Sequence, residues 1–323
     1  MNDICVETNQ MPSIVPGPNL LLIGAPKCGT TSLLLWLRKH PEVYHPWKNY
    51  HSGAWESRFL ISGPLELPIS PQRPRGTLQL PHEIDMDHYR GQRWIIDKSP
   101  QHLYFSRALE SVRDLLPEAR VIITLRDPYD LMISLYSQIR RSVEYDTTFE
   151  SLFNMMQSQD WAADNNNAET WGFLTYPRYS HFVRLWVDEI GADRVRVIPL
   201  SSIAQNSRGV LQDLSDWLGI DSTKMPRNLD VKNPRGQLSN SPFRKFLRKP
   251  PSWVFSAARV LLPSRALRKA LLDPIRRRGW KHVPTSAPEI PPEVEKAIRE
   301  RLSDDTTFFE SLGSLLPSEV IIR

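Results

Sequence analysis

The sequence predicts an α/β fold, in which a parallel β-sheet is flanked by helices on both faces and is followed by a helical, basic C-terminal extension. Three observations lead to this prediction. Short apolar runs recur along the first two thirds of the chain, stretches with helical spacing stand between them, and basic residues gather in the last third. Wholly apolar strands separated by helices are typical of a parallel sheet that is covered on both faces.

The first strand is predicted over residues 20–23, LLLI, and it leads through a glycine-containing loop into a helix over about residues 30–40. The same order recurs later in the chain. Apolar runs at residues 94–96 and 121–125 predict two further strands. Pro128 fits the first turn of a helix that follows the second run, because a proline there loses no helical hydrogen bond.

The pattern continues with a helix over residues 178–190, a strand over residues 195–198 and a helix over residues 210–218 that Gly219 ends. After Pro291 and Pro292 we expect one last helix over about residues 293–312. The side chains of the helix over residues 178–190 that we expect in the core are Phe182, Leu185 and Trp186.

This order of elements predicts three parts. Residues 1–16 form a leader, residues 17–235 form the α/β domain, and residues 236–323 form the basic helical extension, packed on the same domain. Within the domain, residues 64–81 are rich in proline and polar side chains and are expected to form a long surface loop. Prolines also divide the basic extension, which predicts short helices there.

Composition excludes several classes of protein. With 323 residues, 40% of them hydrophobic and 24% charged, the chain is typical of a globular protein. Its two cysteines, Cys5 and Cys28, cannot make a disulfide framework, and neither has metal-ligand spacing. No run of about 18 apolar residues occurs, and Asp3 and Glu7 stand where a signal peptide would be basic. We therefore expect a cytoplasmic protein without signal peptide or membrane span.

Positive charge is concentrated in residues 235–281, which hold 13 Lys and Arg against a single acidic residue, Asp273. Such a segment suits a polyanionic ligand, a membrane surface or nucleic acid, although many charge runs are only solvated faces. The segment would suit an acceptor cleft widened for an anionic glycan, or a membrane surface, since aromatic and aliphatic residues at 253–262 alternate with arginines nearby in the sequence. We expect this segment to contact an anionic substrate or a membrane surface, and we expect no nucleic-acid partner.

The strongest motif is GAPKCGTTS at residues 24–32, between the first strand and the first helix. A loop in this place directs backbone N–H groups and a helix N-terminus toward an anion. Its glycines have the spacing of a P-loop, but Thr30 stands where a P-loop has its lysine, and the lysine is Lys27. The loop is therefore P-loop-like but not that of an ordinary ATPase or kinase. The alternative is that the glycines only make a tight turn.

A second motif is Arg126-Asp127-Pro128 at the end of a predicted strand, with Ser134 two helical turns further on. An arginine and a hydroxyl beside a helix start suit a second phosphate group. The alternative reading of Arg126 is an ordinary surface ion pair.

Together with Asp97-Lys98-Ser99-Pro100, the two motifs resemble the sulfotransferase family that uses 3′-phosphoadenosine-5′-phosphosulfate (PAPS). The resemblance covers residues 17–220 and is closest in pattern to the heparan sulfate and other carbohydrate sulfotransferases and their bacterial relatives. It implies transfer of a sulfuryl group from PAPS to a hydroxyl or amine of a glycan or small-molecule acceptor, with adenosine 3′,5′-bisphosphate (PAP) as product and no metal. A donor with two phosphate-bearing positions also explains two phosphate motifs in one chain.

The resemblance implies a role for each motif. Lys27 would neutralise charge on the departing phosphate, and Lys98 would contact the transferring sulfonate or the acceptor. The 5′-phosphosulfate loop is residues 24–32, and a basic, glycine-containing loop at residues 232–236 stands where the family often covers the 3′-phosphate. The expected donor-binding residues are Pro26, Lys27, Cys28, Gly29, Thr30, Thr31, Ser32, Arg126, Ser134, Lys232, Arg235 and Gly236.

The acceptor must lose a proton to a general base. In the carbohydrate branch of the family a catalytic Glu precedes a Phe by three positions, and Glu56-Ser57-Arg58-Phe59 reproduces this arrangement. Glu56 is therefore the predicted base. His51 is the alternative, because the cytosolic small-molecule branch uses histidine.

Two other functions remain open from the sequence. A P-loop nucleotide kinase or NTPase would share the strand, loop and helix, but it would need the lysine that Thr30 replaces. A basic membrane-binding or nucleic-acid-binding protein would explain the C-terminal charge but not the ordered motifs.

Overall fold

The computed structural model describes residues 17–46, 56, 60, 88–142, 148–157, 168–229, 237–238, 282–283 and 288–313. Its centre is a five-stranded sheet with the strand order β2-β3-β1-β4-β5, in which all neighbouring strands are parallel. The strands are β1 (Leu20–Gly24), β2 (Val43–Tyr44), β3 (Trp94–Lys98), β4 (Arg120–Leu125) and β5 (Val195–Pro199).

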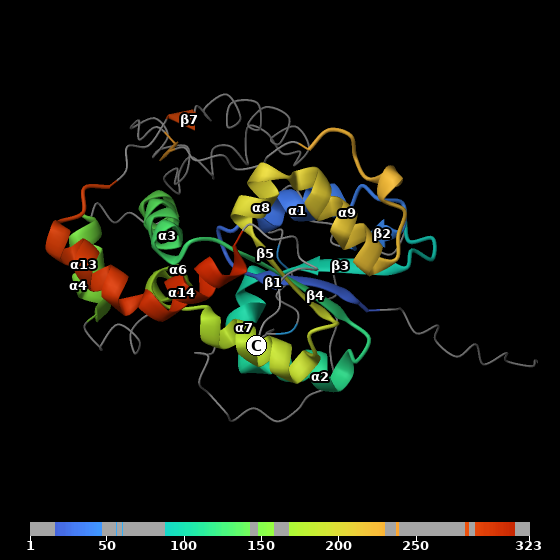
Figure 1. The fold of residues 1–323 in the computed structure, drawn as a ribbon, viewed down its shortest axis with the longest axis horizontal. Coiled ribbons are helices and arrows are strands. Elements are labelled where there is room, and N and C mark those ends of the chain that lie inside the picture. Colours follow the sequence, from blue (N-terminus) through green and yellow to red (C-terminus); the bar gives the residue numbers. More distant parts are fainter. Residues whose placement is uncertain are drawn as a thin grey trace, which may run out of the picture.

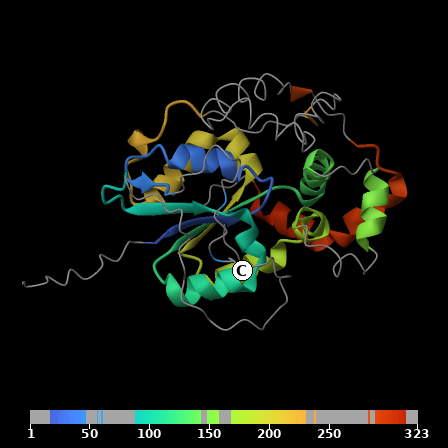
Figure 2. The ribbon, with the colours of Figure 1, turned by 180° about the vertical axis from the view of Figure 1, so that it is seen from behind.

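Helices cover both faces of this sheet (Figures 1 and 2). One face carries α1 (Thr30–Leu37), α8 (Leu200–Gln205) and α9 (Ser207–Leu218), and the other carries α2 (Ser106–Leu115) and α7 (Ser180–Ile190). Successive side chains of a strand point to opposite faces, so β1 supplies Leu20 and Leu22 to one buried cluster and Leu21 and Ile23 to the other. The predicted α/β fold is confirmed.

A group of helices extends the α2 and α7 side of the sheet (Figure 1). It contains α3 (Pro128–Ser142), α4 (Phe149–Gln157), α6 (Ala168–Thr175), α13 (Pro292–Arg301) and α14 (Ser303–Leu312). Short 3₁₀ helices occur at η3 (Pro100–Tyr104) and η4 (Ser222–Lys224), and β6 (Gln237–Leu238) pairs antiparallel with β7 (His282–Val283). The sequence patterns did not predict this last pair.

Most strand and helix predictions are confirmed within one to three residues. Gly219 ends α9 with φ 66° in the left-handed region, as expected of a glycine at this position. The helix begins at Ser207, three residues before the predicted start, because Asn206 caps it through a hydrogen bond from the Gly209 amide to its side chain at 2.9 Å.

Two predictions were wrong. The single last helix is in fact two, α13 and α14, which meet at Leu302. Ser303, Asp304 and Asp305 supply the hydroxyl and the acidic first turn that favour a new helix start. Leu185 is 37% exposed on α7 and does not lie in the core, whereas Trp186 is fully buried there.

The proposed leader at residues 1–16, the surface loop at 64–81 and most of the basic segment at 235–281 lie outside the described residues. The boundaries of the three predicted parts therefore stay predictions. Cys28 is buried and carries a free thiol. None of the helices in the described part of the chain combines the length and the apolar character that a membrane crossing needs.

Candidate active site

The predicted motifs meet at one edge of the sheet. Strand β1 lies between β3 and β4, and because the three are parallel their carboxyl ends open on the same side. Leu22 of β1 pairs with Lys98 of β3, so Lys98 lies beside the start of the loop at residues 24–29. Arg126 follows β4 on the other side of β1. After β1 the chain adds β2 and β3 on one side of it, and it then crosses to add β4 and β5 on the other side. Open parallel sheets bind ligands at the carboxyl ends of the strands where the order reverses in this way.

The loop after β1 leaves the N-terminus of α1 uncovered by side-chain caps. Its N-cap is Gly29, which has no side chain to accept the first N–H groups of the helix, and residues 30–32 bring no acidic group. Gly29 has φ 83°, and a Cβ atom there would come within 2.8 Å of the Leu200 side chain. Lys27, with φ 66°, is also left-handed. The loop therefore leaves the positive end of the α1 dipole uncapped, with Lys27 two residues before the N-cap.

Cys28 lies on the buried side of this loop. Burial raises the pKa of its thiol to about 12, although the charges of Arg126 and Lys27 act in the opposite direction. Its side chain is fully buried, and its Sγ donates to the Pro26 carbonyl at 3.4 Å. If Cys28 contacts a bound nucleotide, as the sequence analysis expects, it would therefore do so through its backbone and not through its thiol. Among the other loop residues, Thr30 and Ser32 are also buried, while Pro26, Lys27 and Thr31 are half-buried.

Two hydrogen bonds fix the loop to the end of β4. The Ala25 amide donates to the Thr124 carbonyl at 2.6 Å, and the buried Thr124 hydroxyl donates to the Gly24 carbonyl at 3.0 Å. Thr124 stands two residues before Arg126. The two predicted phosphate positions are therefore connected through one short piece of backbone.

Lys98 and Glu56 form an ion pair at the carboxyl end of β3. The Lys98 ammonium donates to Glu56 Oε1 at 3.1 Å, and their side chains are 3% and 26% exposed. A lysine this deeply buried needs a compensating charge, because an isolated buried ammonium is costly. The structure thus brings the predicted base next to the lysine that the sequence analysis had placed at the sulfonate.

His45 is a further titratable group near Lys98. It follows β2, whose Val43 and Tyr44 pair with Trp94 and Ile95 of β3, so it lies toward the same edge of the sheet. Burial, with further contributions from the charges of Arg38 and Lys98, lowers its pKa to about 3. The imidazole is therefore neutral around pH 7.

This shift predicts a pH-dependent stability. In the unfolded chain His45 takes up a proton as the pH falls through about 6.5, whereas in the folded chain it does so only near pH 3. The contribution of neutral His45 to the free energy of unfolding is therefore complete above pH 6.5 and is lost as the pH falls toward 3. We expect His45→Gln to remove about 1 to 2 kcal/mol of the stability loss between pH 7 and pH 5, measured by urea unfolding. Equal losses in the wild type and the variant would contradict this.

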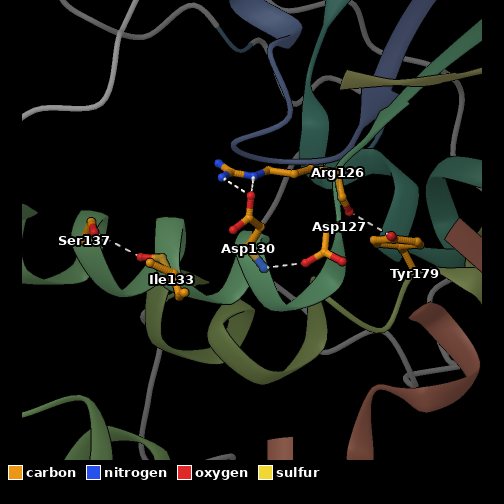
Figure 3. Close-up of polar contacts among 6 residues, drawn as sticks. All are labelled: Arg126, Asp127, Asp130, Ile133, Ser137 and Tyr179. Atoms are coloured by element: carbon orange, nitrogen blue, oxygen red, sulfur yellow. Dashed lines mark hydrogen bonds and ion pairs between the residues drawn. The ribbon is translucent and has the colours of Figure 1, made fainter. Parts of the chain in front are cut away.

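Arg126 is held by an acidic neighbour (Figure 3). Its guanidinium Nη2 donates to Asp130 Oδ2 at 2.7 Å, and its Nε donates to the same oxygen at 3.3 Å. Its carbonyl accepts from the Tyr179 hydroxyl at 2.8 Å, while Asp127 accepts from the Asp130 amide at 2.8 Å. The Arg126 side chain is 11% exposed and that of Asp130 47%. The arginine is oriented, and its partner faces solvent.

Ser134 is half-buried on α3, four residues after Asp130 and thus on the same side of the helix. Ser134 therefore lies on the side of α3 that carries Asp130, the partner of Arg126. Ser137, one turn further, donates to the Ile133 carbonyl at 3.0 Å instead.

Four predicted site residues, His51, Lys232, Arg235 and Gly236, lie outside the described residues. The sequence analysis missed Asp130, Tyr179 and His45. The spacing of Arg126 and Asp130 is a signal for an ion pair. Nothing in the sequence connects Tyr179 with Arg126. Within the described ranges, no group of three or more His, Cys, Asp or Glu residues could hold a metal ion.

The fold and this site define a class of protein: an α/β protein with a glycine- and lysine-containing loop at the switch point of a parallel sheet. Comparison with known proteins finds a matching family model. Residues 79–224 match the model of the Sulfotransferase family. This match confirms the resemblance that the motifs predicted.

Two curated relatives illustrate the similarity. Bifunctional heparan sulfate N-deacetylase/N-sulfotransferase 4 from Mus musculus is 21% identical over 218 residues, which cover 63% of this chain and 22% of that protein. Heparan sulfate glucosamine 3-O-sulfotransferase 3A1, also from Mus musculus, is 21% identical over 210 residues, or 63% of this chain and 46% of that protein. The matched regions span about a fifth to about a half of these relatives.

A solved structure shares the fold. The sulfotransferase from Alicyclobacillus acidocaldarius superimposes with a TM-score of 0.54 at 23% sequence identity, covering 80% of this chain and 97% of that one.

Proposed function

We propose that this protein transfers the sulfuryl group of PAPS to a hydroxyl or amine of a glycan or small-molecule acceptor, with Glu56 as general base. The observation that carries the proposal is the meeting of three motifs at neighbouring strand ends. The Lys27 loop stands at the centre, the Lys98 and Glu56 pair at one side, and Arg126 at the other.

The residues present fit PAPS. The glycine-capped N-terminus of α1 and Lys27 would hold the 5′-phosphosulfate, and Arg126 with Ser134 would hold the 3′-phosphate. ATP would leave the second position unused. When bound, PAPS supplies an activated sulfuryl group.

The chain's own residues would act by charge and position. Lys27 would neutralise charge that develops on the leaving phosphate, and Lys98 would do the same for the sulfonate oxygens. Glu56 would accept the acceptor's proton, and its ion pair with Lys98 would hold its carboxylate beside the reacting group. In the in-line transfer that we propose, the base would lie on the Lys98 side and the leaving group on the Lys27 side.

The names of the relatives support a glycan acceptor. They describe both an N-sulfotransferase and a 3-O-sulfotransferase acting on heparan sulfate, so they support an amine and a hydroxyl equally. The basic segment at residues 235–281 supports an anionic acceptor, since it holds 13 cations against one acid.

A competition between nucleotides tests the donor. We expect PAP to bind more tightly than ATP by about tenfold or more, because only PAP carries the phosphate that Arg126 would pair with. Isothermal titration of the purified chain with each nucleotide measures this. A clear preference for ATP would instead favour a kinase or NTPase. An acceptor screen that follows PAP formation would then identify the second substrate.

A further inference from the structure

The C-terminal helices α13 and α14 pack around the segment that carries Arg126. α14 contacts both α3 and α7, and Ile298, Leu302 and Phe308 are buried in the cluster that also contains the apolar side chains of α3. Figure 1 shows the two red helices beside α3, α4 and α6. They lie outside residues 79–224, so the family match does not account for their contacts.

Asp305 of α14 connects these helices to α7. It is 5% exposed, and its Oδ1 accepts from the Ser180 backbone amide at 2.8 Å. Ser180 is the first residue of α7, so the carboxylate satisfies an N–H group that the helix itself cannot and lies at the positive end of the helix. A buried carboxylate in this position fixes where α7 begins.

Tyr179 continues the connection to the site. It precedes α7, is fully buried, and donates its hydroxyl to the Arg126 carbonyl at 2.8 Å (Figure 3). Its ring also meets that of Phe308 on α14, with centroids 6.4 Å apart. A continuous set of contacts therefore runs from Asp305 through Ser180 and Tyr179 to the backbone of Arg126.

A second contact reaches the same segment from α13. The Arg299 guanidinium lies 4.3 Å from the centroid of the Tyr129 ring. Its Nε donates to Glu295 Oε1 at 2.9 Å, and its Nη2 lies 2.7 Å from the same oxygen. Tyr129 is the second residue of α3, three positions after Arg126. The C-terminal helices thus restrain both the carbonyl of Arg126 and the start of the helix that follows it.

We propose that Asp305 is a positioning residue for the donor's 3′-phosphate, acting through Ser180 and Tyr179 on the backbone of Arg126. The inference rests on the proposed function. Recognition of a phosphate by a guanidinium depends on orientation, and a charge-assisted contact weakens when its supporting contacts are loosened. Asp305 would touch neither the nucleotide nor the reacting atoms. Replacing it should therefore change the affinity for the nucleotide and not the chemical step.

The test uses the full chain and PAP as the probe. Asp305→Ala removes the acceptor for the Ser180 amide, and Asp305→Asn keeps an acceptor oxygen. Asp304→Ala is the matched control, because Asp304 is an exposed residue in the same first turn of α14. We expect Asp305→Ala to weaken PAP binding about 2- to 30-fold, Asp305→Asn to restore most of it, and Asp304→Ala to leave it unchanged.

A second variant distinguishes positioning from simple loss of stability. Tyr179→Phe removes only the hydroxyl that reaches Arg126 and keeps the ring against Phe308. We expect it to weaken PAP binding as well, and the double variant with Asp305→Ala to lose less than the sum of the two effects. A Tyr179→Phe variant with wild-type PAP affinity would overturn the proposal, even if Asp305→Ala did not fold. The proposal would also be overturned if the double variant lost as much PAP affinity as the two single variants together.

Binding must also act in the reverse direction. If Asp305 supports the 3′-phosphate position, then PAP should slow amide hydrogen exchange in α14 of the wild type but not in Asp305→Ala. Failure of the wild type to bind PAP would contradict the proposed function itself. Wild-type PAP binding without protection of α14 would contradict only this inference.

Discussion

Replacing Glu56 with Gln should lower turnover by about 10²- to 10⁴-fold, which is the usual contribution of a general base, while PAP affinity stays at the wild-type value. Glutamine keeps an oxygen that can accept from the Lys98 ammonium, whose side chain is only 3% exposed. The substitution therefore removes the basicity and the charge of the carboxylate and keeps only a hydrogen-bond acceptor for the Lys98 ammonium.

Steady-state assay of PAP formation and titration with PAP measure the two quantities. Glu118→Gln is the matched control, because Glu118 is exposed and precedes β4 at the opposite edge of the sheet. Unchanged turnover in Glu56→Gln would transfer the role of base to His51, which His51→Gln would then test. Loss of PAP affinity together with turnover would show that Glu56 supports the donor site instead.

Replacing Arg126 with Ala should weaken PAP binding by about 10- to 100-fold, because hydrogen bonds to charged groups contribute about 1.5 to 3 kcal/mol each. Asp130 loses its partner in this variant, but it is 47% exposed and remains solvated. We therefore expect little change in folding stability. ATP binding should change much less, since ATP has no phosphate at the 3′ position.

Titration with both nucleotides separates these effects. Arg113→Ala serves as control, because Arg113 is likewise paired with acidic residues, Asp114 and Glu189, but lies on α2 away from the loop. Arg126→Lys keeps the charge and loses the fork of donors, so it should fall between the wild type and Arg126→Ala. Equal weakening of PAP and ATP would place Arg126 at a phosphate that both nucleotides share.

Local signals were sufficient for four of the five strands of the sheet and for the loop after β1, whereas the two-residue strand β2 was not predicted. A wholly apolar run predicts a buried strand, and a glycine next to a run of hydroxyl residues predicts the start of α1, because both depend on neighbouring residues alone. The same holds for Gly219 as a helix end. Strand ends then bring Lys27, Lys98 and Arg126 to one edge without further information.

The contacts that complete the site could not be predicted in the same way. Tyr179 and Asp305 reach Arg126 only through packing of helices that are distant in sequence, and no spacing records such a contact. The break between α13 and α14 did have a local signal, in Ser303 and the two acids after it. Leu185 was misassigned because helical periodicity identifies a face but not where its edge becomes exposed.

The position of β1 between β3 and β4 has a consequence for how the protein acquires its activity during synthesis. The loop at residues 24–29 is among the first parts of the domain to be made, yet both its flanking strands are made much later. A nascent chain that ends before β4 has neither Arg126 nor the Thr124 carbonyl to receive the Ala25 amide. Donor binding should therefore appear abruptly with chain length, and folding of the site should be slow because its contacts are non-local.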